Sequence, residues 1–284
     1  MRHVFLIKML TAAIALFLSA NCGHTVVTTP EVHAIAADRI TLDPDDSVWE
    51  SAPTHIAKLI PQDLVEPRQM APTTAEVRVK AITKDGQIAF RMEWSDDTQN
   101  DAPGPRKPVD AAAVQLPAVI QANAPAPQMG EQGMTVEIAY WRADWQASVN
   151  GRPDGIRALH PNASVDHHPY EAKPLENNEE ARRRAELRYA PAKALGNVRS
   201  GPWEVAFEDL IAEGPGTLTP APARHTSGIG KWSDTGWAVV FVRPIPNGFS
   251  ATRPTQVAFA VWEGTHGEAG SRKMRTGWIN LLAK

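Results

Sequence analysis

The pattern that most constrains the fold of this chain is a hairpin signature between Val77 and Trp94. In its first arm, valines alternate with basic residues from Val77 to Lys80, and in its second arm four large apolar residues share one face from Ile88 to Trp94. The arms are separated by Asp85-Gly86, a dipeptide that favours a tight β-turn. The segment therefore predicts two antiparallel strands with one buried face.

The same period-two alternation recurs along the chain, between stretches rich in Gly, Pro and Asp. Most of the 24 prolines lie between the apolar segments, which suits a loop-rich β protein. Short strands divided by such turns predict an all-β fold, an antiparallel β-sandwich with short helices. The further strand segments are His33–Pro44 with its turn, Ala111–Pro117, Val136–Trp141, Trp237–Val242, Val257–Trp262 and Trp278–Leu282.

The alternation breaks down between Gly151 and about Ala223, which we interpret as a long loop-rich insertion. The charged run Glu179–Leu187 predicts a short solvated helix, and Trp203–Ala212 is a candidate for a second helix. We therefore expect one sandwich domain over residues 32–284, carrying the insertion at about residues 151–223, and no second domain.

The N-terminus has the pattern of a secretory signal peptide over residues 1–22. A basic start is followed by the short apolar block Met9–Ala20, although a buried N-terminal helix is the alternative. Cys22, the only cysteine, stands where a bacterial lipoprotein is acylated, but Asn21 replaces the expected small residue. We expect an exported, periplasmic or extracytoplasmic protein without a transmembrane span, and a lipid anchor at Cys22 stays open.

Several functional classes lack their signatures. The formal charge of −3 gives no electrostatic case for binding nucleic acid. The chain has no G-x-S-x-G elbow, no H-E-x-x-H helix and no phosphate-binding glycine loop. It also lacks C-x-x-C-H, so no covalently attached c-type haem is expected, and one cysteine cannot build a zinc–thiolate or iron–sulfur site.

Two clusters of polar residues could bind a metal ion, but for each of them the sequence favours a simpler explanation. Asp96 and Asp97 form an acidic pair on a polar loop, where carboxylates are usually solvated, and a calcium site is the less favoured alternative. His167 and His168 are adjacent in the insertion. Neighbouring side chains of a strand point to opposite faces, so both rarely bind one metal ion.

Two loops remain as candidates for a binding site. Met129 stands in a proline-rich loop directly before a strand, where it is either ordinary packing or a soft metal ligand. After the strand that ends at Trp262, a glycine-rich loop carries the basic residues Arg272, Lys273 and Arg275, a cluster that is most often a solvated turn. Two such loops could also meet at one edge of a sandwich and hold a flat ligand.

An ordered set of motifs resembles one known family. The set comprises QMG before a strand with WRADW, and FAVWEG followed by RK and a closing tryptophan, with AAAVQLP and WAVVFVRPI in support. It resembles the haem b-binding gamma subunits of type II dimethyl-sulfoxide-reductase-family molybdoenzymes. Ethylbenzene and dimethylsulfide dehydrogenases and chlorate and selenate reductases have such subunits, and nitrite oxidoreductases have related ones. The resemblance extends over Val32–Leu282.

The resemblance implies one non-covalent haem b, with Met129 and Lys273 as its axial ligands. Met134, five residues further on, is the alternative ligand if the register is shifted. An arginine is expected to pair with a haem propionate, because guanidinium suits carboxylate, and tryptophans are expected to form the pocket walls. The residues implied for these two roles are Arg272 or Arg275 and Trp141, Trp262 and Trp278.

This ligand set implies electron transfer and not catalysis, because a six-coordinate iron has no open position for a substrate. The implied partners are an iron–sulfur beta subunit, a molybdopterin alpha subunit and a soluble c-type cytochrome or similar carrier. The insertion is expected to face the iron–sulfur partner. The alternatives are a haem-free extracytoplasmic sandwich that binds carbohydrate through exposed tryptophans, and a purely structural subunit.

Overall fold

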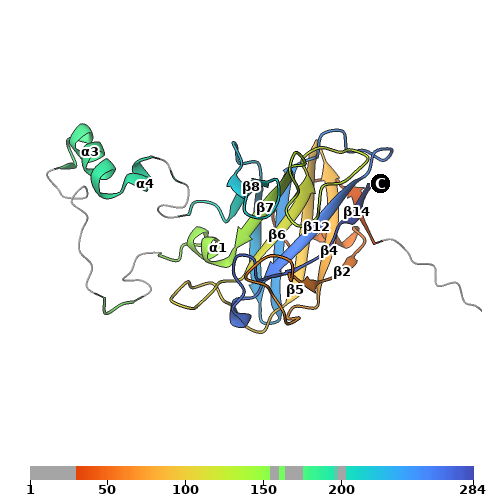
Figure 1. Cartoon of the computed structure of the whole chain (residues 1–284), viewed down its shortest axis with the longest axis horizontal. Helices are drawn as coiled ribbons and strands as arrows, with labels where there is room; N and C mark the ends of the chain where they lie inside the picture. The colour runs from red at the N-terminus through yellow and green to blue at the C-terminus, as the bar shows by residue number, and fades with distance from the viewer. Residues whose placement is uncertain (1–29, 154–159, 164–174, 196, 198–202) are drawn as a thin grey trace, which may run out of the picture.

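The computed structural model describes residues 30–153, 160–163, 175–195, 197 and 203–284, and these form a β-sandwich with peripheral helices (Figure 1). The predicted signal peptide, Cys22 and the His167-His168 pair lie outside the described residues. The strands are β1 (Glu31–Ala36), β2 (His55–Lys58), β3 (Ile60–Pro61), β4 (Glu76–Lys84), β5 (Gln87–Ser95), β6 (Ala111–Pro117), β7 (Val136–Arg142), β8 (Phe207–Ala212), β9 (Thr219–Pro220), β10 (Ser227–Ser233), β11 (Gly236–Pro244), β12 (Thr255–Trp262), β13 (Met274–Arg275) and β14 (Ile279–Ala283).

Two sheets are joined through β12, which takes part in both. The first sheet has the order β10-β11-β5-β4-β1-β14, and the first part of β12 pairs with β14 from Thr255 to Val257. From Ala258 to Trp262 the same strand pairs with β6, and the second sheet continues through β7, β8 and β9. The predicted all-β sandwich is confirmed, and β1 adds parallel pairings to β4 and β14 in an otherwise antiparallel arrangement of the described strands.

The predicted hairpin forms as β4 and β5. Asp85 and Gly86 both have positive φ, 46° and 76°, which matches the twist of a two-residue hairpin turn. The alternating apolar side chains of both arms enter the core between the sheets, where Phe90 meets Phe259 of β12 edge to face at 6.2 Å between ring centroids. Period-two alternation thus fixes which face of this hairpin is buried.

The region between β7 and β8 departs in part from the prediction. The predicted second helix at Trp203–Ala212 is wrong, because β8 lies there and pairs antiparallel with β7. The edge of β7 offers a backbone ladder, and Phe207 fills a place in the core that a helix would vacate. As a result, β8 and β9 belong to the second sheet although they lie inside the stretch predicted as an insertion.

The helices are short and peripheral. The helix predicted at Glu179–Leu187 is confirmed as α3, whose N-terminus is capped by the Asn178 side chain accepting from the Ala181 amide at 2.9 Å. Figure 1 shows α3 and α4 away from the two sheets. Among the described residues no helix is both long and apolar enough to cross a membrane. The helices are η1 (Ser47–Glu50), α1 (Ala143–Val149), α3 (Glu179–Tyr189), α4 (Pro191–Ala194) and η4 (Gly264–His266).

Candidate cofactor-binding face

On the outer face of the second sheet, three small side chains form a low surface, here called the alanine floor: Ala111 and Ala113 on β6 and Ala260 on β12. Ala113 on β6 lies opposite Ala260 on β12, and Ala111 lies opposite Trp262. Larger side chains of the same face stand beside this floor, since Ala113 is flanked on its other side by Tyr140 and Ala260 by Arg275. Strand positions usually hold β-branched or aromatic residues, so small side chains here keep this surface of the sheet low, although the alanines themselves are buried, with exposures of 1% for Ala111, 4% for Ala113 and 9% for Ala260.

The loop between β6 and β7 folds over this face and brings Met129 to it. The half-buried Met129 packs against the apolar cluster that includes Ala111, Ala113 and Trp262. Two hydrogen bonds fix the loop: Gln115 Nε2 donates to the Pro127 carbonyl at 3.0 Å, and Trp278 Nε1 donates to the Pro125 carbonyl at 2.6 Å. The position of Met129 is therefore set by its surroundings and not by the loop alone.

Met129 also has a backbone conformation that its residue type disfavours. Its φ of 68° lies in the left-handed region, and its carbonyl accepts from the Gly214 amide at 2.8 Å. The next residue, Gly130, has a φ of 80°, and a Cβ there would lie 2.7 Å from the Met134 carbonyl oxygen. A non-glycine residue held in this region is a strained position of the kind that clusters at functional sites.

Lys273 reaches the same face from the end of the loop between β12 and β13. Its Nζ lies 4.8 Å from the centroid of the Trp262 ring, which belongs to the cluster that Met129 contacts. Trp262 Nε1 donates to the Gly270 carbonyl at 3.0 Å and so ties this loop to the strand. Burial lowers the pKa of Lys273 to about 8, and the charge of Arg275 contributes to the same effect.

Arg275 is a buried cation without an ion-pair partner among the described carboxylates. It is 8% exposed, its Nε has no hydrogen-bond partner, and its Nη1 makes a long contact of 3.4 Å with the Thr276 carbonyl. Burial lowers the pKa of this guanidinium, and the charge of Asp63 acts in the opposite direction. A buried guanidinium whose Nε–H has no partner, at a position opposite Ala260, can bind an anionic group.

The other predicted site residues fall in different places. Trp278 packs against the cluster at this face, whereas Trp141 points the opposite way into the core, where it is fully buried beside Trp237 at 4.9 Å between ring centroids. Trp141 is therefore not a wall of this face. Met134 lies in a tight turn, exchanging backbone hydrogen bonds with Glu131 at 2.8 and 3.3 Å, and Arg272 is exposed on its loop.

Two features of this face are not among the predictions made from the sequence. The alanines at Ala111, Ala113 and Ala260 carry a usable signal, because they occupy alternate positions where a buried strand favours larger residues. Tyr140 contributes an aromatic edge, with its ring centroid 5.3 Å from that of Trp262. Tyr140 and Trp141 are adjacent on β7 and therefore point to opposite faces of the sheet. Only the pairing of the assembled strands shows which of the two faces the core.

The fold and this face define an all-β protein whose second sheet carries a thioether packed on its outer apolar cluster, a lysine amine of lowered pKa beside Trp262 and a buried arginine opposite Ala260. In the described part of the chain, no three or more His, Cys, Asp or Glu side chains form a metal-binding group. The sequence model of the ethylbenzene dehydrogenase family matches residues 46–274, so the chain belongs to that family. The predicted family resemblance is thereby confirmed.

Two relatives have names that specify a subunit. A Haloferax mediterranei protein provisionally named respiratory nitrate reductase heme subunit is 23% identical and covers 98% of this chain and 80% of its own length. The chlorate reductase subunit gamma of Ideonella dechloratans is 23% identical over 84% of this chain and 78% of its own length. Among solved structures, a family 9 carbohydrate binding module from Caldicellulosiruptor kristjanssonii in complex with cellotriose aligns with a TM-score of 0.44 and 10% identity, over 89% of this chain and 93% of that one.

Proposed function

We propose that this chain is a non-catalytic electron-transfer subunit that binds one haem b non-covalently on the outer face of the second sheet. The observation that supports the proposal is that Met129 packs against the apolar cluster to which Trp262 belongs, while Lys273 Nζ lies 4.8 Å from the centroid of the Trp262 ring, although the two residues come from loops more than a hundred residues apart in the sequence. The sulfur of a thioether and the nitrogen of an uncharged amine can both donate a lone pair to haem iron. The names of the two relatives support a haem-carrying subunit of this kind.

The residues present fit the cofactor. Lysine ligates only as the free amine, and burial beside Trp262 and Arg275 lowers the pKa of Lys273 to about 8, so the free amine is accessible near neutral pH. Met129 ligates at any pH because its thioether does not titrate. Haem iron, when bound, supplies reversible one-electron chemistry, and a methionine ligand favours the reduced state. With both axial positions filled by the chain, no position stays open for a substrate.

The rest of the face provides the shape and charge that a haem needs. The alanine floor accepts a planar ring, while Trp262, Tyr140 and Trp278 exclude water from its sides. Arg275 is assigned to a propionate in preference to Arg272, because Arg275 is buried with an unpartnered Nε and Arg272 is exposed. A charge-assisted hydrogen bond to a propionate would satisfy that Nε.

The proposed partners follow from the same relatives, which are named as subunits of nitrate and chlorate reductases. We place the chain between the iron–sulfur beta subunit of a molybdoenzyme complex, whose alpha subunit carries molybdopterin, and a soluble c-type cytochrome or similar carrier. The basic and apolar N-terminal segment supports export to the periplasm or another extracytoplasmic compartment, with Cys22 as a possible point of lipid attachment.

The visible spectrum of the purified chain, matured with haem available, tests the proposal. We expect a Soret band, sharp α and β bands on reduction, one haem per chain, and complete extraction of the haem by acidified organic solvent because no covalent bond holds it. A protein that stays colourless after such maturation contradicts the proposal, as does haem that resists extraction.

A further inference from the structure

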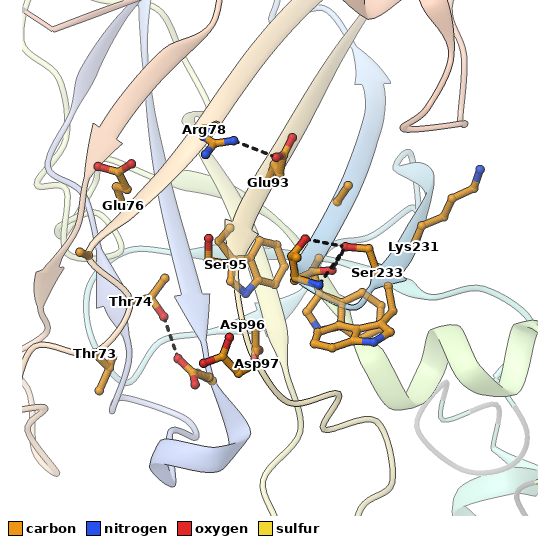
Figure 2. A pocket seen from close by; sticks show the side chains of 18 of the residues that line it. Thr73, Thr74, Glu76, Arg78, Glu93, Ser95, Asp96, Asp97, Lys231 and Ser233 are labelled. Atoms are coloured by element: carbon orange, nitrogen blue, oxygen red, sulfur yellow. Dashed lines mark hydrogen bonds and ion pairs between the residues drawn. The ribbon is translucent and has the colours of Figure 1, made fainter.

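A cavity of about 680 Å³ is lined by none of the three alanines of the proposed haem face. It is lined by the segment leading into β4, by the end of β5, by the β10–β11 hairpin and by the loop that follows Trp262. Figure 2 shows Asp96 and Asp97 at its lower edge, with Thr73 and Thr74 beside them. The alanine-floored haem face makes no use of this cavity.

Two buried carboxylates line the cavity, Asp96 at 3% and Glu263 at 8% exposed, and two more buried carboxylates, Glu268 and Asp110, accept hydrogen bonds from the backbone amides of Glu263 and Gly264. Burial raises the pKa of Asp96 to about 7 and that of Asp110 to about 6, and burial also raises the pKa of Glu268. The charge of Glu263 contributes to each of these three increases. Burial therefore disfavours the charged forms of Asp96, Asp110 and Glu268, and a nearby counter-charge would offset that cost.

The nearby cations of the chain do not supply that counter-charge. Arg78 and Arg91 both pair with Glu93, at 3.1 and 2.5 Å, and Lys231 pairs with Asp45 at 3.0 Å. His266 contacts Glu263 at 3.0 Å but is roughly half exposed and cationic only when protonated. Asp110 and Glu268 instead accept from neutral donors, so their charges are solvated locally but not neutralised.

One oxygen of the Asp96 carboxylate is buried without a partner, whereas both carboxylate oxygens of Asp110 and of Glu268 accept hydrogen bonds. The Oδ1 of Asp96 accepts from the Thr98 amide at 2.9 Å, whereas its Oδ2 is buried without a hydrogen bond. Asp96 is 3% exposed and lines the cavity. Trp94, which also lines the cavity, has an unpartnered Nε1–H. A lone acceptor and a lone donor at one wall fit a hydrated cation, in which the ion meets the carboxylate and one of its waters accepts from the indole.

We propose that this cavity binds a hard divalent cation, with calcium as the best fit, between the carboxylates of Asp96 and Glu263. The hydroxyl of Thr74, 3.1 Å from Glu263 Oε2, is a further oxygen donor within reach of the site. Only two carboxylates take part, so water fills the remaining positions. Calcium accepts six to eight oxygen ligands in irregular geometry, whereas magnesium demands a small regular octahedron.

Such a cation would act on the loop that carries Lys273. Glu263 directly follows Trp262 in the sequence and begins the segment that leads through η4 to Lys273. The amide of Glu263 also donates to Glu268 Oε2 at 3.0 Å, which closes the first turn of that segment. Binding at Glu263 therefore stabilises the loop from its start, without touching the haem face.

Thermal unfolding of the full mature chain, stripped with EDTA and then titrated with CaCl2, tests the site. At a calcium concentration about a hundredfold above Kd, we expect Tm to rise by roughly 5–10 °C, with a smaller rise for MgCl2 and none for KCl of equal ionic strength. Asp96→Asn should abolish the calcium response and raise the cation-free Tm, because it removes a repelled charge. Asp85→Asn, in the exposed turn between β4 and β5, should keep the full response.

Three results would overturn the site: a calcium response no larger than that of KCl, a full response in Asp96→Asn, or a loss of the response in Asp85→Asn. A wild-type protein that ignores calcium but gains Tm as the pH falls from 8 to 6 would show that protonation of Asp96, whose pKa burial raises to about 7, removes the buried charge instead. The haem spectrum, recorded on the same samples, should be the same with and without calcium, so failure of this site is distinguishable from failure of the haem proposal.

Discussion

Replacing Lys273 by methionine should stabilise the haem-free protein while it removes one of the two proposed ligands. A pKa of about 8 in place of 10.5 means that the folded protein disfavours the ammonium. At about 1.4 kcal/mol per pH unit, the cost at pH 7 is roughly 3 kcal/mol. Because the side chain keeps some contact with water, we expect Lys273→Met to gain about 1–3 kcal/mol.

The gain in stability from Lys273→Met should depend on pH, and the lowered pKa of Lys273 gives the direction of that dependence. The pKa of Lys273 is lower in the folded than in the unfolded chain, so the cost is fully present below pH 8. It shrinks as the pH rises through the folded pKa and vanishes above the unfolded value of 10.5. The advantage of Lys273→Met should therefore be largest at pH 7 and fall below about 1 kcal/mol at pH 10.

Urea titration of the haem-free protein at both pH values measures this difference as a change in the free energy of unfolding. Arg272→Met is the matched control, because Arg272 is the exposed neighbour on the same loop and should change the free energy by less than about 0.5 kcal/mol. Destabilisation by Lys273→Met, or an equal gain at pH 7 and pH 10, would refute the idea that burial holds this lysine ready to lose its proton.

Three further substitutions test the rest of the face. Met129→Gly should change the stability of the haem-free protein by less than about 1 kcal/mol, because glycine accepts a φ of 68° but the packing of the half-buried methionine is lost, yet it should lower the haem midpoint potential in a redox titration; an unchanged potential would exclude Met129 as a ligand. Arg275→Met should weaken haem binding roughly 10- to 100-fold in a haem titration, whereas Arg272→Met should not, and equal effects would remove the propionate assignment. Ala113→Leu should block haem uptake, and because Ala113 is only 4% exposed it should also lower the free energy of unfolding by about 1–3 kcal/mol; normal haem content in the folded variant would show that the floor is not the binding surface.

The strands of the fold could be predicted from the sequence because their signals are local. Alternation on both sides of Asp85-Gly86 specifies β4 and β5, and the run Ala111–Pro117 matches β6 residue for residue. The change of sheet along β12 could not be predicted, since it depends on pairing with β14 at one end and β6 at the other. The segment of β8 is wrongly predicted as a helix for a similar reason. Its pairing with β7, which no local pattern reveals, determines its structure.

The site shows the same division between local and non-local information. The ligand roles of Met129 and Lys273 are implied by the family resemblance. The sequence pattern alone does not distinguish a packing role for Met129 from a ligand role. Whether Trp141 or Tyr140 faces the core is a question of one residue in register, and the pairing of Tyr140 with Ala113 answers it. Likewise, Arg275 and not Arg272 is at the face because Arg275 pairs with Ala260, a contact that no local pattern reveals.

The central claim is that Met129 and Lys273 together hold the haem iron, and the near-infrared charge-transfer spectrum of the ferric protein tests it most directly, because this band reports the pair of axial ligands. We expect a low-spin methionine–amine band in the wild-type protein and its loss in both Lys273→Met and Met129→Gly. A wild-type band of another ligand pair, or a band that survives unchanged in both variants, would contradict the account.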